Sequence, residues 1–291
     1  MEAVVTWIAE TLVRALALGT PLLWAALGEV YAERSGVVNL GVEGMMILGA
    51  FAAFAVAQTF GRPEVGLLAA AGVGGVAALL HAFVAVTLRA NQYVSGLALT
   101  MLGLGLSALL GRRWEGLPLL NTLPEVSGVT FGGVLLAVLL WFVLYHTAWG
   151  VALRSAGEAP AAVDAVGINV ALVRYLAVVL GGMLAGVGGG FLSVAYRPSW
   201  TEGMTAGLGW IAIAIAIFAA WDPLRAVAGA VLFGGLFHLS FRLQTWIPPE
   251  PLQLMPFAVT ILVLAAAGRG GARRWGGAPE ALGLPYSRGE P

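Results

Sequence analysis

The polar side chains best suited to chemistry in this chain lie at or inside long apolar runs. Glu43 sits well within one run, where an acidic group costs roughly 2.5–3.5 kcal/mol at mid-membrane depth. Asn39 precedes it, and Asn91, Gln92 and Ser95 open a later run. Amides, hydroxyls and a carboxylate in apolar surroundings can hydrogen-bond a hydroxylated small molecule. These five residues are therefore our candidates for contact with a polar solute.

Three glycines around Glu43 favour a break in the helix there. Gly36, Gly41 and Gly44 permit unwound backbone or close packing, which is tolerated at membrane depth only beside a cavity or within packed protein. The alternative is that residues 29–34, with Glu29, Glu33 and Arg34, form a solvated loop and that Glu43 lies in an interfacial turn.

Several kinds of chemistry have no candidates in the sequence. All fifteen basic residues are arginine, so neither a phosphate-binding P-loop nor a lysine Schiff base is expected. There is no cysteine, hence no thiolate nucleophile or cysteine metal site. His81, His146 and His238 are isolated and lack the spacing of metal ligands. We expect no catalytic residue, no metal site and no cofactor bound by this chain, so it is not expected to be an enzyme.

The composition indicates an integral membrane protein. The chain has 291 residues, of which 59% are hydrophobic and 10% charged, far from the usual soluble range. Allowing about 20 residues per crossing, we predict an all-α polytopic helical bundle of about nine spans, within a range of eight to ten. The predicted spans are Trp7–Leu27, Val37–Phe60, Val65–Leu88, Tyr93–Leu110, Phe131–Tyr145, Tyr175–Ala195, Ala206–Trp221, Ala226–Phe241 and Leu252–Ala267.

An odd number of spans places the two termini on opposite sides of the membrane. Arginine is more frequent on one set of connections, which favours a cytoplasmic C-terminus. The first span is the least defined, because Glu10 and Arg14 would also suit a surface helix over Met1–Leu18. We divide the chain into a transmembrane permease domain, residues 1–268, and a flexible cytoplasmic tail, residues 269–291, where glycines alternate with charges. No internal repeat is evident.

A polar island at residues 150–169 interrupts the apolar runs. Pro160 suits the first turn of a helix, two alanines follow it, and Gly167 can take the left-handed stop. A helix of about two turns is too short to be stable alone in water. The island therefore predicts a small helix that docks on something else.

A second feature concerns packing between helices. Gly182, Gly186 and Gly190 recur at four-residue spacing and would let another helix approach closely. Whether that helix belongs to this chain or to a partner is left open by the sequence.

Two stretches together resemble a known family. Residues 33–46, ERSGVVNLGVEGMM, resemble the signature of bacterial ATP-binding-cassette (ABC) importer permeases for nucleosides and simple sugars, which are grouped with ribose and branched-chain amino-acid permeases. Residues 149–169 are similar to the cytoplasmic coupling loop of that group. Residues 91–99 and 221–225 add weaker matches, and the resemblance covers most of residues 25–235.

This resemblance implies a division of labour among subunits. The chain would form the substrate pathway in the inner membrane together with a second permease, as a heterodimer, while a separate ABC ATPase binds ATP and magnesium. An extracytoplasmic substrate-binding lipoprotein would deliver the small polar solute, and no nucleic-acid polymer is expected as a partner. The positions that match the family's coupling helix, which contacts the ATPase, are Gly157, Glu158, Pro160, Ala161, Ala162, Asp164 and Gly167.

Two other classes of membrane protein are alternatives to an importer permease. An ion-coupled secondary transporter should offer more than one ionisable residue at mid-membrane depth, and only Glu43 fits. A membrane-embedded enzyme would need a cluster of catalytic polar residues, and the sequence suggests none. The identity of the solute, whether nucleoside, pentose or another small polar molecule, is not determined by these residues.

Overall fold

The computed structural model describes residues 2–268 and 277–288, without the side chains of 2–9, 249, 250, 253, 263, 264 and 266–268. Its α-helices are α1 (Glu2–Arg34), α2 (Val42–Phe60), α3 (Pro63–Ala82), α4 (Gln92–Gly111), α5 (Gly128–His146), α6 (Ala148–Glu158), α7 (Pro160–Ala165), α8 (Val170–Phe191), α9 (Leu208–Phe218), α10 (Pro223–Leu243) and α11 (Pro249–Gly268). Short turns of other helix types extend three of them: η1 (Phe83–Thr87), η2 (Arg112–Trp114) and η3 (Leu192–Tyr196). In the described part of the chain the only β-structure is two isolated bridges. The predicted all-α fold is confirmed.

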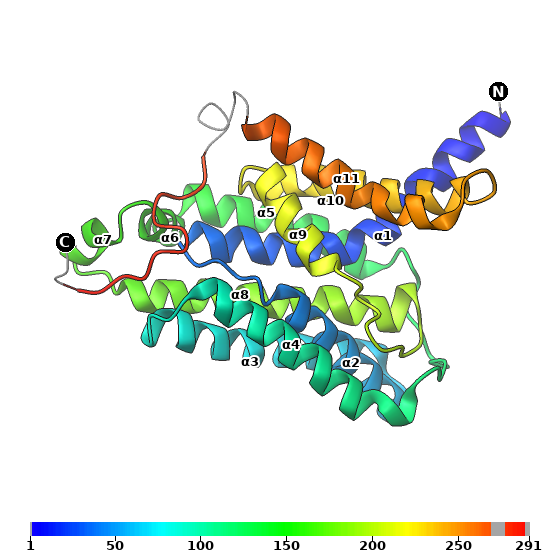
Figure 1. The fold of residues 1–291 in the computed structure, drawn as a ribbon, viewed down its shortest axis with the longest axis horizontal. Coiled ribbons are helices and arrows are strands. Elements are labelled where there is room, and N and C mark those ends of the chain that lie inside the picture. The colour runs from blue at the N-terminus through cyan, green and yellow to red at the C-terminus, as the bar shows by residue number, and fades with distance from the viewer. Residues whose placement is uncertain (1, 269–276, 289–291) are drawn as a thin grey trace.

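The long helices form a bundle whose axes lie roughly along its length (Figure 1). Within the described residues, 7 helices are long and apolar enough to cross a membrane. Each of the nine predicted spans contains a helix, although α9 has only 11 residues. The polytopic architecture is therefore as expected. Two of the predicted spans are not among the 7: α9, where part of the apolar run is unwound, and α11, some of whose side chains lie outside the described residues.

Helix α1 is longer than predicted and removes the solvated loop considered above. It continues for 33 residues to Arg34. Glu29 and Glu33 lie in its last turns and are buried, at 0% and 3% exposure. The helix continues to Arg34 because α8 and α10 pack along it. In addition, Asn39 donates a hydrogen bond to the Glu29 carboxylate and Trp221 donates one to the Glu33 carboxylate.

Two stretches of the bundle follow the same course in opposite directions (Figure 1). Helices α1 and α8 run antiparallel, with Gly28 against Gly181. Each is followed by non-helical chain that turns back to the middle of the bundle, where α2 and α9 begin. In the same order, α3 corresponds to α10 and α4 corresponds to α11. The contacts are reciprocal as well, since α3 packs on α8 as α10 packs on α1. Together these features form an inverted repeat of the kind common in transporters, which was not evident from the sequence.

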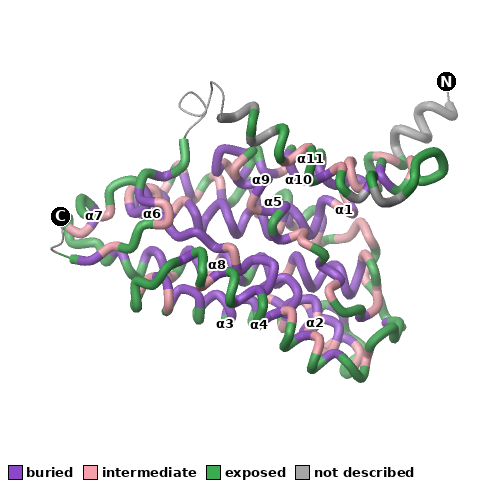
Figure 2. Tube along the Cα trace, in the orientation of Figure 1, coloured by how far each residue is buried: buried purple, intermediate pink, exposed green. Residues whose placement is uncertain are grey.

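Burial divides the helices into a central and an outer group. The chain is buried along α1, α2 and α8, and exposed positions lie mainly on the peripheral helices (Figure 2). Many exposed positions carry large apolar side chains, such as Leu68 on α3, Met101 on α4 and Leu135 on α5. Apolar surface of this extent suits contact with lipid or with another membrane subunit.

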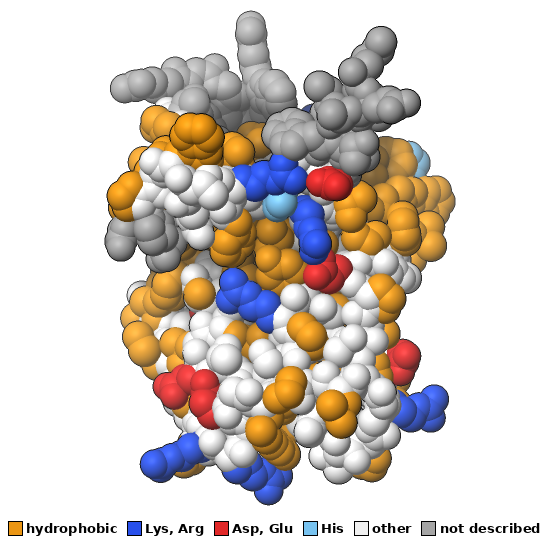
Figure 3. Space-filling model, turned by 90° about the vertical axis from the view of Figure 1, so that its right-hand side faces the viewer, with side chains coloured by type: hydrophobic (Ala, Val, Ile, Leu, Met, Phe, Trp, Pro, Cys, Tyr) orange, Lys and Arg blue, Asp and Glu red, His pale blue; other side chains and the backbone are white. Residues whose placement is uncertain are grey.

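The end of the bundle opposite α6 and α7 carries charged side chains beside a hollow (Figure 3). Arg14 of α1 pairs with Glu125, in the connection before α5. Arg242 of α10 lies 3.4 Å from Glu10 of α1. A cavity of about 290 Å³ at this end is lined by residues of α1, η3, α9, α10 and α11 and of the connection between η3 and α9. The ion pairs fix α1 to its neighbours around this opening.

The glycines at four-residue spacing face α3 of the same chain. A Cβ at Gly186 would collide with the carbonyl oxygen of Ala70, and one at Gly182 would collide with Ala78. A Cβ at Gly190 would lie 2.8 Å from that of Ala70. Contact between backbones at this distance is what small residues provide in membrane proteins, where dispersion forces hold helices together.

The α3–α8 contact predicts different effects for two alanine substitutions on α3. Gly74→Ala should lower stability by about 1–3 kcal/mol because its Cβ would collide with α8. Gly72→Ala, two residues away, meets nothing within 4 Å and should be neutral or slightly stabilising. Thermal unfolding of the purified protein in detergent would measure both variants; equal unfolding temperatures would contradict the close packing of α3 on α8.

Candidate coupling element and the broken helices

The predicted short helix is present at one end of the bundle. Pro160 occupies the first turn of α7. The helix ends near Gly167, which has a φ of +85° and whose N–H donates to the Asp164 carbonyl at 2.9 Å. Proline at the start and a left-handed glycine past the end are the expected signals. Together α6 and α7 form what we call the coupling element, residues 148–165.

Helix α6 was not anticipated, and it supplies the support that α7 needs. Thr147 caps its first turn through Gly150 N–H at 3.2 Å. Leu153 and Gly157 are buried against the bundle, and Gly157 touches the carbonyl oxygen of Arg34 at the end of α1. In residues 148–158 glycine, arginine and serine interrupt the apolar pattern, and contact with α5, α8 and α1 favours the helix.

One face of the coupling element is free of contacts with the bundle. Glu158, Ala161 and Ala162 are exposed, and Val163 is the buried residue that anchors α7. Small exposed side chains on a short helix allow a partner surface to approach the backbone closely.

A segment near the C-terminus, residues 277–288, packs onto the coupling element. Ala281 N–H donates to the Gly157 carbonyl at 2.8 Å, and Glu280 N–H to the Glu158 carboxylate at 3.2 Å. Arg288 lies 3.1 Å from Asp164. These contacts differ from the expectation of a flexible tail for this part of residues 269–291; positions 269–276 and 289–291 lie outside the described residues.

The junction beneath the coupling element is organised by Arg174 of α8. This side chain is 2% exposed. Its guanidinium donates to the carbonyls of Ser35 at 3.2 Å, Leu284 at 3.0 Å and Ala156 at 3.4 Å. Carbonyls at helix C-termini carry partial negative charge, so Arg174 joins the ends of α1 and α6 to the C-terminal segment.

The break predicted near Gly36 and Gly41 is a buried, non-helical segment between α1 and α2, residues 37–41. Its backbone polar groups have partners on other helices. Gln92 Oε1 accepts from Val38 N–H at 2.8 Å, and His81 Nε2 lies 3.0 Å from the Val38 carbonyl oxygen. Thr100 donates to the Leu40 carbonyl at 3.0 Å. Without such partners, unwound backbone in an apolar interior would be very costly.

Glu43 joins α2 and α9, the two broken helices, each of which begins inside the bundle after a non-helical segment. It begins α2, is 3% exposed, and its carboxylate accepts from Thr205 Oγ1 at 2.6 Å. It also accepts from the backbone N–H groups of Gly207 at 2.9 Å and Gly209 at 2.7 Å. Gly209 lies in the first turn of α9, whose free N–H groups favour an anionic acceptor. The carboxylate thus caps α9 from another helix.

The end of α1 holds the other end of α9. Arg34 donates from Nε to the Trp221 carbonyl at 3.1 Å and from Nη2 to the Ala220 carbonyl at 3.0 Å. The Trp221 indole N–H donates to Glu33. Ala220 and Trp221 both have positive φ, +51° and +55°, and Arg34 satisfies carbonyls that this bend leaves without helix donors.

The solute candidates from the sequence are distributed around the unwound segment. Asn39 donates to Glu29 at 2.7 Å, Asn91 is exposed and caps α4 at Val94, and Ser95 lies 2.9 Å from His81 Nδ1. Three buried polar atoms here lack a hydrogen-bond partner among the described residues: Glu29 Oε2, Asn39 Oδ1 and Gln92 Nε2.

Several residues of this site were not singled out from the sequence. Thr100, Thr205 and Gly209 lie in apolar or glycine-containing stretches and give no signal without the fold. His81 stood out only as an isolated polar residue. A cue was available for Gly207, because a glycine before a short apolar run often marks a broken helix.

Comparison with known proteins gives the family. Residues 11–264 match the family described as "Branched-chain amino acid transport system / permease component". The chain belongs to this permease family. With its apolar helices, it is therefore a multi-pass protein of the plasma membrane.

Relatives of the permease carry transport names. NupQ of Bacillus subtilis, a guanosine ABC transporter permease protein, is 35% identical over 94% of this chain and 95% of its own length. NupC of Lactococcus lactis, a nucleoside ABC transporter permease protein, is 34% identical over 86% and 89%. TsgC13 of Haloferax volcanii, whose name assigns it to glucose transport, is 38% identical over 85% and 88%.

A solved structure shares the fold of the permease. A chain described as an inward-facing conformation of a metal-chelate type ABC transporter aligns with a TM-score of 0.50 at 17% identity, covering 88% of this chain and 85% of that one. The arrangement of helices is thus found in an ABC transporter of distant sequence.

The junction at Glu43 predicts an energetic coupling between α2 and α9. Glu43→Gln replaces one accepting oxygen with a donor and removes the charge, and we expect a loss of about 1.5–3 kcal/mol. Thr205→Val removes one donor to the same carboxylate. The two losses should be less than additive, with a coupling of about 0.5–3 kcal/mol in unfolding measurements. The exposed Glu64→Gln serves as control, and strict additivity would argue against the junction.

Proposed function

We propose that this permease imports a nucleoside or a simple sugar as part of an ABC transporter. The proposal is supported by the names of relatives that align along most of both chains, two assigned to nucleosides or guanosine and one to glucose. The chain contains no lysine and therefore no P-loop lysine, which agrees with nucleotide hydrolysis in a different subunit. A separate ATPase subunit would then bind ATP and magnesium, and this chain would bind no cofactor.

The coupling element is the proposed docking site for that ATPase. The observation that carries this assignment is the position of α7 at the tip of the bundle, with Ala161 and Ala162 exposed and Val163 buried beneath them. A groove on the ATPase would receive this alanine face, and Glu158, Asp164 and the turn at Gly167 would lie at its rim.

Force on α7 would reach the membrane segments through direct contacts. Helix α6 abuts the end of α1 at Gly157 and Arg34, and Arg34 holds the bend after α9. A shift of α6 would therefore move the end of α1 and, with it, the connection between α9 and α10. Packed elements transmit such shifts because they do not deform continuously.

The remaining partners follow from the same proposal. A second permease subunit, in a heterodimer, would close the pathway against this chain, and an extracytoplasmic lipoprotein would deliver the solute. With the ATPase bound at α7 and the lipoprotein on the extracytoplasmic side, the end of the bundle that bears α6 and α7 would be cytoplasmic.

The solute route is proposed to pass the unwound segment. Buried polar atoms without partners are costly, and Asn39 Oδ1 and Gln92 Nε2 are two such atoms beside it. Hydroxyls of a nucleoside or sugar would satisfy them during transport, with Glu43, Asn91 and Ser95 as the other candidate contacts. The energetic cost in the solute-free protein then becomes a source of solute affinity.

A substitution on the alanine face tests ATPase docking. Ala162→Arg should abolish insertion into a groove, and ATP-driven uptake in proteoliposomes with the ATPase, the second permease and the lipoprotein should fall at least roughly tenfold, equivalent to about 1.4 kcal/mol. Ala148→Arg, exposed at the far end of α6, introduces the same charge and should transport normally. Unchanged uptake by Ala162→Arg would contradict the docking assignment.

A second substitution tests the solute route. Gln92→Glu keeps an oxygen to accept from Val38 N–H while replacing the donor Nε2. We expect the apparent affinity for guanosine or glucose to weaken roughly tenfold, the size of one polar contact, with assembly onto the ATPase retained. Gln58→Glu makes the same chemical change in the last turn of α2, away from the unwound segment, and is the matched control. Equal uptake affinity in both variants and the unmodified protein would exclude Gln92 from the route.

A further inference from the structure

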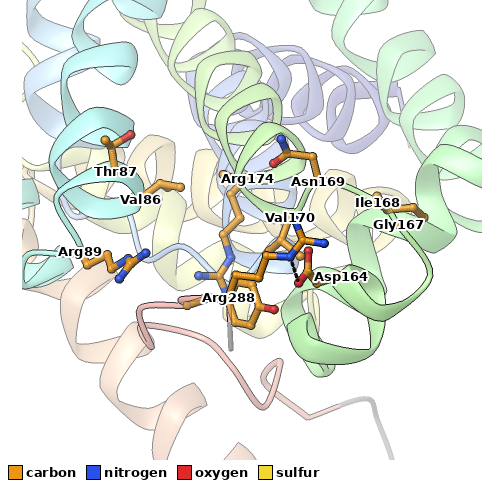
Figure 4. A pocket seen from close by; sticks show the side chains of 12 residues that line it. Val86, Thr87, Arg89, Asp164, Gly167, Ile168, Asn169, Val170, Arg174 and Arg288 are labelled. Atoms are coloured by element: carbon orange, nitrogen blue, oxygen red, sulfur yellow. Dashed lines mark ion pairs between the residues drawn. The ribbon is translucent and has the colours of Figure 1, made fainter. Parts of the chain in front are cut away.

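A cavity of about 550 Å³ opens beside the coupling element, between the end of η1, the start of α8 and the C-terminal segment. Three arginines from these elements line it, Arg89, Arg174 and Arg288, together with one carboxylate, Asp164 (Figure 4). Three guanidinium groups against one carboxylate leave two positive charges. Asp164 is already engaged, because it pairs with Arg288 at 3.1 Å.

The charge of Arg174 has no carboxylate beside it. The side chain is 2% exposed, and its recorded partners in the described part of the chain are three backbone carbonyls. Charges this deeply buried are normally paired with an opposite charge. Carbonyl dipoles at helix ends offset only part of a full charge, so an anion in the cavity would stabilise Arg174 further.

Arg89 presents a free guanidinium to the same space. Its backbone has a φ of +54°, a conformation in which glycine or asparagine is usual at the end of a helix. No hydrogen bond or ion pair of its side chain is recorded among residues 2–268 and 277–288. In Figure 4 the guanidinium groups of Arg89 and Arg174 point toward one another across the cavity. Two like charges so placed repel each other unless an anion lies between them.

The start of α8 completes the wall. Asn169 caps the helix by accepting from Leu172 N–H at 3.0 Å, and Val170 and Ala171 contribute to the lining. The first N–H groups of a helix have no acceptors within it and attract anions. Guanidinium groups and helix N–H groups are the donors that phosphate binds best.

We propose that this cavity binds a phosphate group, carried either by an anionic phospholipid of the adjoining leaflet or by a soluble phosphate compound. The bound phosphate would bridge Arg89 after α3, Arg174 on α8 and Arg288 of the C-terminal segment. It would thereby hold residues 277–288 against the coupling element. This inference does not depend on which solute the permease transports.

The test uses the full-length protein in nanodiscs of zwitterionic phosphatidylcholine. Inorganic phosphate is titrated against chloride at equal ionic strength, and a second series replaces a fixed fraction of the lipid with phosphatidylglycerol. Unfolding temperature is measured in both series, and native mass spectrometry counts retained phosphatidylglycerol. We expect a saturable rise in unfolding temperature, with affinity weakened roughly tenfold in Arg89→Gln. Arg62→Gln, which removes an exposed charge at the opposite end, should respond like the unmodified protein.

The two series distinguish the sources of the phosphate. Stabilisation by phosphatidylglycerol alone assigns the site to a lipid headgroup, and stabilisation by inorganic phosphate assigns it to soluble phosphates. Arg288→Gln, at an 82% exposed side chain, gives an independent variant if Arg89→Gln unfolds. The proposal is overturned if neither ligand stabilises the unmodified protein, or if both cavity variants respond as it does. Stabilisation by the ATPase subunit alone would also overturn it and assign the arginines to that protein.

Discussion

The structure depends on satisfying backbone polar groups in the interior of a membrane bundle. Residues 37–41 leave the helix at a depth where water cannot replace the lost hydrogen bonds. Gln92 and Thr100 on α4 and His81 on α3 provide the replacements. The unwound segment is therefore stable only where α3 and α4 lie, and it in turn fixes where α2 begins. The two stretches of family resemblance at residues 33–46 and 91–99 come together at this point because each provides hydrogen-bond partners that the other needs.

Helix α9 is joined to α2 by hydrogen bonds to a carboxylate. Glu43 accepts three hydrogen bonds at the start of α9, and the end of α1 holds the bend that follows α9 through Glu33 and Arg34. Both ends of this short helix are thus held by residues from the opposite half of the inverted repeat. Since α6 abuts α1 at Gly157, the coupling element, the end of α1 and the two broken helices form one mechanical unit. A unit of this kind can convert movement at the tip of the bundle into movement at mid-depth.

Much of the fold was predictable from local patterns. Apolar runs of membrane length located the helices, glycines 36 and 41 indicated the break, and Pro160 with Gly167 marked α7, because these signals depend on neighbouring residues in the chain. Predictions that depended on distant contacts fared differently. The alternative that placed Glu29 and Glu33 in a solvated loop is wrong, because both lie within α1, where Asn39 and Trp221 donate hydrogen bonds to their carboxylates. Residues 277–288 resembled a flexible tail, yet their backbone pairs with Gly157 and Gly36.

The sequence by itself determined that the protein is a helical membrane bundle with a polar island, a short helix that begins at Pro160 and a break beside Glu43, since hydropathy and helix-breaking residues act locally. Only the tertiary structure decided what Glu43 does. A carboxylate inside an apolar run could bind solute, exchange a proton or cap a helix, and the choice depends on which groups lie within about 3 Å. Here those groups are Thr205, Gly207 and Gly209, more than 160 positions along the chain. The same reason explains why the inverted repeat and the arginine-lined cavity were invisible before the chain was folded.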